Sequence, residues 1–304
     1  MSVYVFGEIL WDVYPDNKVI GGAPFNFSAH LSSLGIKSYL VSAVGEDDLG
    51  RETLECVSVK NVDGTYVKLS EKPTGVCNVT LNDAKIPSYT LVEEVAYDYI
   101  SVSDEDISCI NLSDSKSLYI GTLAMRSKIS ENTAKKLVSS CKWDNIFFDV
   151  NIRQHFYCRE IIEYGLNVCN ILKFSREEAY IFSETGLSEY DGTEASLREL
   201  CNDLARRYNI EYILLTLDKD GAAVYIREND EFVFSEKTDC KVVSTVGAGD
   251  SFFAAYINAY LKGESVEKCL SDAIVLSGYV VGHVEAVPVY SKELLQQLNR
   301  QTVE

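Results

Sequence analysis

The stretch STVGAGDSFFAAY, residues 244–256, places two glycines immediately before an apolar run with the pattern of a helix. Gly247 and Gly249 let the backbone turn tightly, so several amide N–H groups point the same way at the positive end of the helix dipole. Such a helix start can bind an anion. Asp250 lies in the first turn, where a carboxylate can accept the proton of a hydroxyl that attacks a phosphoryl group. A plain helix cap without catalytic role is the alternative for this stretch taken alone.

Outward from this stretch, short apolar runs alternate with amphipathic segments along most of the chain. The runs expected to form buried strands are 3–9, 38–44, 117–120, 145–150, 170–174 and 212–217. The segments expected to form helices are 24–34, 47–58, 130–140, 176–183, 194–208, 248–261, 265–281 and 291–298. This alternation predicts an α/β fold, a doubly wound and mostly parallel sheet with helices on both faces.

Two regions interrupt the alternation with β patterns that lack a helix. One is short and rich in turn residues, at about 13–20, and the other covers about 63–95. We expect them to form a small sheet inserted in a single domain that spans residues 1–304. A lid over a binding site and a plain extension of the main sheet both fit the pattern.

Composition narrows the classes of partner. The chain has 304 residues, and its 46 acidic and 28 basic side chains give a formal net charge of −18. Such a charge argues against nucleic acid or an anionic membrane as the partner. No run of 18 apolar residues is found, so we expect no membrane span. Nine cysteines without a C-x-x-C pair, and a start without a signal-peptide pattern, favour a cytoplasmic protein with reduced thiols.

Familiar nucleotide motifs are missing. The sequence contains no G-x-x-x-x-G-K-[ST], which excludes a P-loop enzyme. Gly7 is followed by Glu8 rather than by a second spaced glycine, which argues against dinucleotide binding. Ligands of open α/β sheets gather beyond the carboxyl ends of the strands, where Asp12 and Asn26 are expected. Their carboxylate and amide groups can bind vicinal hydroxyls; a surface turn and a helix cap are the alternatives.

Five motifs together resemble a known family. They are GEILWD at 7–12, GGAPFN at 21–26, VGEDDLG at 44–50, DVNIR at 149–153 and GAGD at 247–250. Their order and spacing resemble those of the PfkB/ribokinase-like sugar kinases, over roughly residues 3–288. FDVNIR at 148–153 and PTG at 73–75 look most like the bacterial fructokinase branch.

The resemblance implies a ribokinase-like fold with a β lid, and transfer of the γ-phosphoryl of ATP to a sugar's primary hydroxyl. In this family the GAGD aspartate is the base, a role that falls on Asp250, and the amides of Gly247, Ala248 and Gly249 form the anion hole. The sugar-binding positions of the family correspond here to Asp12, Gly21, Gly22, Asn26 and Arg153.

The resemblance also assigns a nucleotide side. The T-x-G-x-x-G segment beside adenine corresponds to Thr216 through Gly221, and Gly247 and Gly249 also face the nucleotide. Glu178 takes the place of the glutamate that positions Mg²⁺ through water. ATP and Mg²⁺ are therefore the expected cofactors, and relatives often form homodimers through the lid.

Three departures from the family pattern lie on the nucleotide and cation side. Ser244 replaces an aspartate that commonly helps to hold a monovalent cation, which puts K⁺ activation in doubt. Asp218 replaces the first glycine of T-x-G-x-x-G and adds a negative charge near the nucleotide phosphates. The segment 282–288 is an unusual version of the loop beside adenine.

The lid sequence bears on the acceptor. Relatives that bind sugar acids carry Tyr-x-Arg there, whereas this chain has Tyr89-Thr90-Leu91, which favours a neutral sugar. A sugar phosphate would need basic residues, and the region offers only Lys68, Lys72 and Lys85. Fructose, phosphorylated at its 6-hydroxyl, is the leading expectation. Another sugar stays open, as do a nucleoside bound by Phe25, Tyr89 or Tyr97 and a degenerate relative that binds sugar without phosphorylating it.

Overall fold

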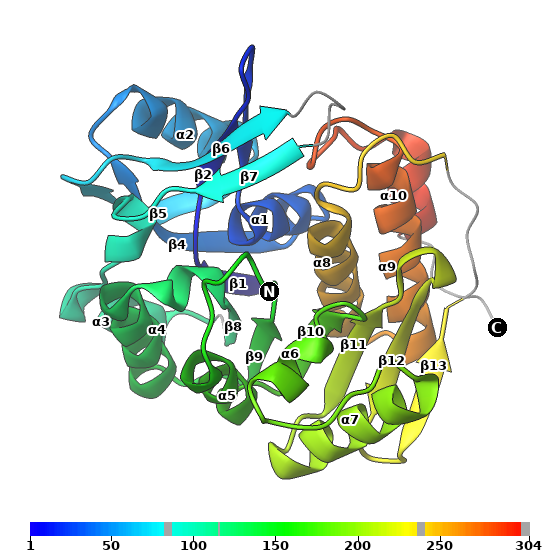
Figure 1. Ribbon diagram of the computed structural model, residues 1–304. Helices are drawn as coiled ribbons and strands as arrows, with labels where there is room; N and C mark the ends of the chain where they lie inside the picture. Colours follow the sequence, from blue (N-terminus) through cyan, green and yellow to red (C-terminus); the bar gives the residue numbers. More distant parts are fainter. Residues whose placement is uncertain (82–86, 115, 236–240, 299–304) are drawn as a thin grey trace.

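The computed structural model describes residues 1–81, 87–114, 116–235 and 241–298. Within these residues the chain forms one large sheet and one small sheet (Figure 1). The order of the large sheet is β13-β12-β11-β10-β9-β8-β1-β4-β5. Its strands are β1 (Ser2–Phe6), β4 (Lys37–Gly45), β5 (Asp63–Ser70), β8 (Ser117–Gly121), β9 (Asn145–Asp149), β10 (Ile171–Ser175), β11 (Tyr212–Thr216), β12 (Ala222–Ile226) and β13 (Glu231–Phe234). Pairing is parallel from β5 to β11 and antiparallel for the last two strands, which confirms the predicted fold class.

Helices cover both faces of the large sheet. One face packs against α1 (Ala23–Ser33), α2 (Asp48–Val59), α8 (Ala248–Leu261), α9 (Val266–Val281) and α10 (Lys292–Leu298). The other packs against α3 (Asp104–Leu112), α4 (Lys128–Ser140), α5 (Arg159–Val168), α6 (Tyr180–Glu184) and α7 (Glu194–Arg207). Within β9, Phe147 belongs to the first core and Phe148 to the second. Because successive side chains point to opposite faces, a strand buried on both sides is apolar throughout, as the sequence indicated.

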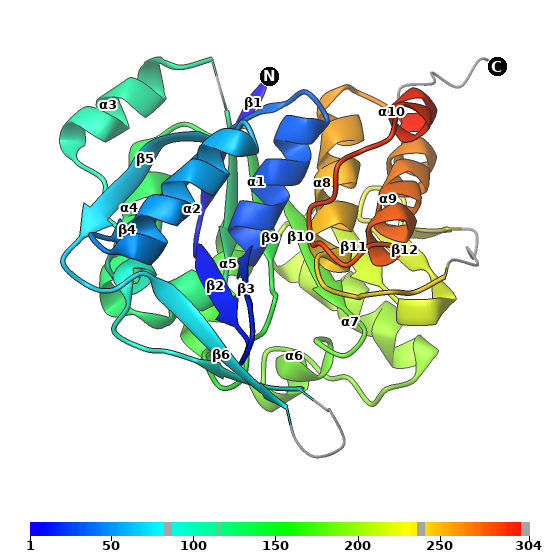
Figure 2. The same cartoon turned by 90° about the horizontal axis from the view of Figure 1, so that it is seen from above.

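The small sheet has the order β3-β2-β6-β7. Its strands are β2 (Leu10–Val13), β3 (Lys18–Gly21), β6 (Gly75–Leu81) and β7 (Pro87–Leu91), and they project from one end of the molecule (Figure 2). The predicted boundaries were wrong in one respect, since residues 63–70 form β5 at the edge of the large sheet. An alternating apolar pattern shows that a segment is a strand but does not show which sheet it joins.

Other differences concern short elements. Helices α3 and α5 and the antiparallel pair β12–β13 were not predicted, and the helix expected over 176–183 is limited to Tyr180–Glu184. Lys85 lies outside the described residues. A helix with the length and apolarity needed to cross a bilayer is not found in the part of the chain that the structure describes.

Candidate active site

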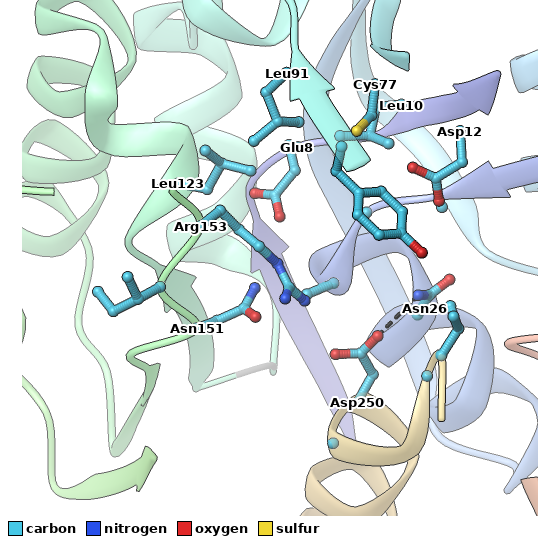
Figure 3. A pocket seen from close by; sticks show the side chains of 18 of the residues that line it. Glu8, Leu10, Asp12, Asn26, Cys77, Leu91, Leu123, Asn151, Arg153 and Asp250 are labelled. Atoms are coloured by element: carbon cyan, nitrogen blue, oxygen red, sulfur yellow. Dashed lines mark hydrogen bonds between the residues drawn. The ribbon is translucent and has the colours of Figure 1, made fainter. Parts of the chain in front are cut away.

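A cavity of about 680 Å³ lies between the carboxyl ends of the parallel strands and the small sheet (Figure 3). The predicted site residues that line it are Asp12, Gly21, Gly22, Asn26, Arg153, Glu178, Thr216, Gly247, Gly249 and Asp250. An adjoining hollow of about 580 Å³ is lined by Ala248 and Gly221 and shares Thr216 and Gly249 with the first. The structure thus brings every predicted site residue to one of two adjoining hollows.

Asp250 lines the first hollow and directly follows Gly249, which lines both hollows. Helix α8 begins at Ala248 after Gly247, whose φ of +80° is left-handed. A Cβ on Gly247 would come within 2.6 Å of the carbonyl oxygen of Ala286, so this turn requires glycine. Asp250 is buried in the first turn of α8, and its Oδ2 accepts a hydrogen bond of 2.8 Å from Asn26 Nδ2. Burial raises the pKa of Asp250, and the bond from Asn26 partly offsets this effect.

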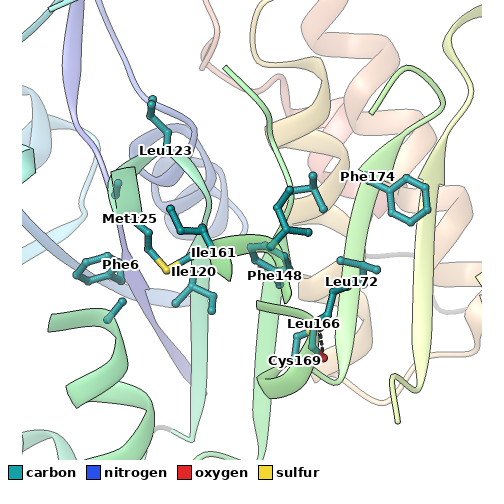
Figure 4. Close-up of a cluster of buried hydrophobic side chains, with 14 of the residues drawn as sticks. Phe6, Ile120, Leu123, Met125, Phe148, Ile161, Leu166, Cys169, Leu172 and Phe174 are labelled. Atoms are coloured by element: carbon teal, nitrogen blue, oxygen red, sulfur yellow. Dashed lines mark hydrogen bonds between the residues drawn. The ribbon is translucent and has the colours of Figure 1, made fainter. Parts of the chain in front are cut away.

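Lys173 is a buried cation that the sequence analysis missed. On β10, Leu172 and Phe174 point into one core (Figure 4), and Lys173 lies on the opposite face, beneath the start of α8. A Cβ on Gly249 would lie 3.2 Å from Lys173 Nζ. Lys173 Nζ also lies 2.9 Å from Asp149 Oδ1 in a fully buried ion pair. The only sequence signal for it is a lysine within the apolar strand ILKFS.

Nearby carboxylates keep the side chain of Lys173 protonated. Burial lowers the pKa of Lys173, but the carboxylates of Asp149 and Glu178 raise it, and the net shift is upward. The ammonium therefore stays protonated in a cavity whose other described charged groups are mainly carboxylates. A fixed cation at this position suits a site at which negative charge develops.

Glu178 joins the loops that follow β9 and β10. Its Oε1 accepts a hydrogen bond from the backbone N–H of Ile152, and its Oε2 accepts one from the backbone N–H of Ser175, each at 2.7 Å. Both oxygens keep a further lone pair, with which they can accept a bond from a water on Mg²⁺. In the described residues no group of three or more His, Cys, Asp or Glu is placed to hold a metal. The free lone pairs of Glu178 fit a magnesium ion that is reached through water.

The small sheet and the loop after β9 form the other end of the cavity. Asp12 on β2 lines it beside Cys77, and burial raises the pKa of Asp12 while the Cys77 thiol and the Arg153 guanidinium partly offset this rise. Arg153 is exposed, and Tyr89 and Leu91 of β7 line the same wall. Gln154 Nε2 donates a hydrogen bond of 2.7 Å to the carbonyl of Tyr89, which ties this loop to the small sheet.

Two of the aromatic residues considered for a nucleoside base do not reach the cavity. Phe25 and Tyr97 are buried in the hydrophobic cores, and only Tyr89 of the three lines the cavity. Neither Lys68 nor Lys72 lines the cavity. Lys68 is paired with Asp106, and Lys72 is paired with Glu94. The described lid residues therefore supply no free lysine to a phosphate or carboxylate group of an acceptor.

Two residues that depart from the family pattern on the nucleotide side, Asp218 and Ser244, are compatible with the local backbone conformation. Asp218 has a φ of +54°, so this residue takes the conformation for which glycine is usual and the turn persists. Asp218 lines the second hollow together with Lys219 and Gly221. Ser244 Oγ accepts a hydrogen bond of 3.2 Å from the backbone N–H of Val246, so its side chain stabilises the loop before Gly247.

Comparison with known proteins agrees with this geometry. The model of the pfkB family of carbohydrate kinases matches residues 12–292. The chain is 30% identical over 261 residues to the sugar kinase PH1459 of Pyrococcus horikoshii, covering 83% of this chain and 77% of that protein. It is 28% identical over 305 residues to an ATP-dependent 6-phosphofructokinase of Thermoanaerobacterium thermosaccharolyticum, covering 94% and 89% of the two chains.

Solved structures show the same fold. The crystal structure of PH1459 in complex with ATP has a TM-score of 0.77 at 26% identity, with 94% of each chain covered. A fructokinase from Vibrio cholerae O395, bound to fructose, ADP and calcium ion, has a TM-score of 0.81 at 18% identity and 99% coverage of each chain. The chain belongs to the pfkB family of carbohydrate kinases, phosphotransferases with an alcohol group as acceptor, which confirms the resemblance drawn from the five motifs.

Proposed function

We propose that this protein transfers the γ-phosphoryl group of ATP to the primary hydroxyl of a neutral sugar, with D-fructose converted to fructose 6-phosphate as the leading reaction. The observation that carries the proposal is the buried Asp250 carboxylate, held by Asn26 in the first hollow and next in the chain to Gly249, which lines both hollows. One hollow can then hold the acceptor and the other the nucleotide.

In this reaction Asp250 removes the proton from the attacking hydroxyl. Its raised pKa gives the ionised carboxylate a higher proton affinity, and the bond from Asn26 fixes its orientation. The backbone amides at Gly247, Ala248 and Gly249 face the moving phosphoryl group as the anion hole, and the Lys173 ammonium beneath them adds a fixed positive charge. The step is in-line transfer governed by positioning and charge.

On the donor side, Thr216 and Gly221 would flank the nucleotide, and Glu178 would hold the magnesium ion through water. Magnesium, when bound to the phosphates of ATP, neutralises their charge and orients the transferred group. Ser244 lacks the carboxylate with which relatives help to hold a monovalent cation, so K⁺ is expected to have little effect.

The cavity charges favour an uncharged acceptor. Glu8, Asp12 and Asp250 line the acceptor end, where Arg153 is the cation that the described residues provide. Leu91 stands at the lid position that carries arginine in relatives that bind sugar acids, and it too lines the cavity. A phosphate or carboxylate group on the acceptor would lie close to these carboxylates. The repulsion between like charges is strong in a buried site.

A coupled ADP-release assay with Mg-ATP tests the proposal. The panel contains fructose, other neutral hexoses and pentoses, a sugar acid, fructose 6-phosphate and a nucleoside, each with and without K⁺. We expect the highest kcat/KM with a neutral sugar, and ³¹P NMR of the product should show a primary phosphate ester. Fructose 6-phosphate is the informative competitor, because a 6-phosphofructokinase is among the relatives; a higher kcat/KM for it would contradict the proposal.

The main alternative is a relative that binds sugar but does not phosphorylate it. Neutral sugars would then raise the melting temperature while ADP release stayed at background with every acceptor. The retained Asp250 and its bond to Asn26 favour the kinase. A cytoplasmic location and a homodimer formed through the small sheet stay predictions.

A further inference from the structure

Glu8 is a buried carboxylate to which the mechanism above gives no role. It lies two residues after the end of β1, is only 2% exposed, and still lines the cavity that contains Asp250 (Figure 3). Its Oε2 has no hydrogen-bond partner among the described residues. A buried carboxylate oxygen without a partner costs free energy, so its retention in a binding cavity calls for a ligand group that satisfies it.

The surroundings of Glu8 are mostly apolar. Leu10, Leu91 and Leu123 line the same part of the cavity and are labelled around the Glu8 carboxyl group in Figure 3. Burial raises the pKa of Glu8 to about 7, although backbone amides of Glu8 and Ala23 partly stabilise the charged form. The apolar wall thus leaves one hydrogen-bonding group that an incoming polar ligand can use.

The backbone of Glu8 is closely packed in this position. Gly22 packs against it so closely that a Cβ on Gly22 would lie 2.6 Å from the Glu8 carbonyl oxygen. The next residues after Glu8 lead into β2, so its backbone is fixed between the large and the small sheet. A fixed group loses little conformational freedom when a ligand binds, which makes it suited to selecting one hydroxyl of a sugar.

Arg153 and Asp250 place Glu8 relative to the reacting centre. The Arg153 guanidinium lies between the carboxyl groups of Glu8 and Asp250 in the cavity (Figure 3), and it lowers the pKa of both. An acceptor whose primary hydroxyl reaches Asp250 can therefore present another hydroxyl toward Glu8 and Arg153. This arrangement separates the hydroxyl that reacts from a hydroxyl that is recognised.

On the basis of the proposed function, we propose that Glu8 is a specificity-determining residue whose Oε2 accepts a hydrogen bond from a non-reacting hydroxyl of the acceptor sugar. The same carboxylate repels an acceptor that carries a carboxylate or phosphate at that position. The acceptor class is therefore an uncharged polyhydroxylated sugar with a free hydroxyl directed at the end of β1.

The test compares Glu8→Leu and Glu8→Gln with the unchanged protein on the best neutral sugar and on its monodeoxy analogues. A hydrogen bond to a charged group typically changes affinity by roughly 10- to 100-fold, so we expect Glu8→Leu to raise the KM for the sugar by about this factor. Glu8→Gln, which keeps an acceptor oxygen, should raise it less. The KM for ATP should stay within about twofold in both variants.

One deoxy analogue should identify the hydroxyl that Glu8 recognises. The unchanged protein should lose affinity for the analogue that lacks this hydroxyl, whereas Glu8→Leu should bind that analogue and the parent sugar equally well. Glu131→Gln is the matched control, because Glu131 is a mostly buried carboxylate on α4 that pairs with Lys128 and Lys135 away from the cavity. It should leave every KM unchanged.

A purely structural role for Glu8 would give a different pattern. In one case the variants would lose thermal stability and lose activity on all analogues by one common factor. In the other case they would keep the KM of every sugar. Either result overturns the proposal. Sugar-induced shifts of the melting temperature give a readout independent of turnover. If no neutral sugar is phosphorylated and none raises the melting temperature, the proposed function and the role of Glu8 fall together. If neutral sugars react but Glu8→Leu leaves each KM unaltered, only the role of Glu8 fails.

Discussion

The buried carboxyl group of Glu8 makes a quantitative prediction about stability and pH. Its pKa rises from an ordinary value of 4.5 to about 7 because burial disfavours the charged form. One pKa unit corresponds to about 1.36 kcal/mol, so ionised Glu8 destabilises the folded protein by about 3 kcal/mol. The carboxyl group of Glu8 binds its proton more tightly in the folded state than in the unfolded state. The contribution of protonated Glu8 to the free energy of unfolding is therefore complete below pH 4.5 and is lost as pH rises through 7.

Glu8→Gln removes this titration and keeps the shape of the side chain. Its neutral amide can take the place of the carboxyl group at the cavity wall. The variant should therefore gain stability relative to the unchanged protein as pH rises, by about 2 to 3 kcal/mol between pH 5 and pH 8. The groups that face Glu8 are Arg153, Asp250, Tyr97 and Tyr119, and they are present in both proteins, so their own titrations largely cancel in the difference.

Urea unfolding of both proteins at pH 5, 6, 7 and 8 measures this difference. Glu131→Gln is a control of opposite sign: partial burial raises the pKa of Glu131, but its ion pairs with Lys135 and Lys128 lower it overall. Glu131 therefore contributes stability above pH 4.5, and its variant should be the less stable protein at pH 8. Parallel pH profiles for Glu8→Gln and the unchanged protein, within about 0.5 kcal/mol, would refute the account of Glu8 as an uncompensated buried carboxyl.

Three further predictions address the transfer step. Asp250→Asn should lower kcat by roughly 10²- to 10⁴-fold with little change in sugar affinity, and near-normal turnover would remove Asp250 as the base. Lys173→Met should lower kcat by about 10²-fold and destabilise the fold by about 3 kcal/mol, because Asp149 is left unpaired. Adding Asp149→Asn should restore stability by urea unfolding but not kcat, whereas recovery of both would make Lys173 purely structural. With Ser244→Asp, ADP release should be faster in K⁺ than in Na⁺. Equal rates in the two salts would show that residue 244 has no part in cation binding.

Much of the fold and the site follows from the sequence, for a physical reason. Parallel strands bring their carboxyl ends to one edge of a sheet, so a residue placed at such an end or at the helix that follows is placed in space as well. Asn26 and Asp250 are 224 residues apart in the chain, and yet they are bonded at 2.8 Å because α1 and α8 both begin at that edge. Motif order alone could predict this proximity.

The parts that could not be predicted depend on which neighbours a residue meets. β5 has the alternating pattern of the small sheet, but parallel pairing with β4 places it in the large one. Lys173 in an apolar strand has no visible partner in the sequence, because Asp149 lies on the adjacent strand at the register position that β9–β10 pairing creates. Glu8 belongs to the motif GEILWD, but the sequence assigned it no role, and only the burial of its side chain distinguishes it from a solvated carboxylate.

The charges of the cavity explain how one site can keep acceptor and donor apart. Carboxyl groups of Glu8 and Asp12 line the acceptor end, whereas the start of α8 and the Lys173 ammonium lie at the transfer point. A phosphate group is therefore attracted to the positive helix end and repelled by the acidic end, and an uncharged sugar experiences neither force strongly. Because the pKa values of Glu8, Asp12 and Asp250 are all raised by burial, this separation weakens as pH falls and the carboxyl groups become neutral. Discrimination against a phosphorylated acceptor should accordingly decline on the acid side of pH 7.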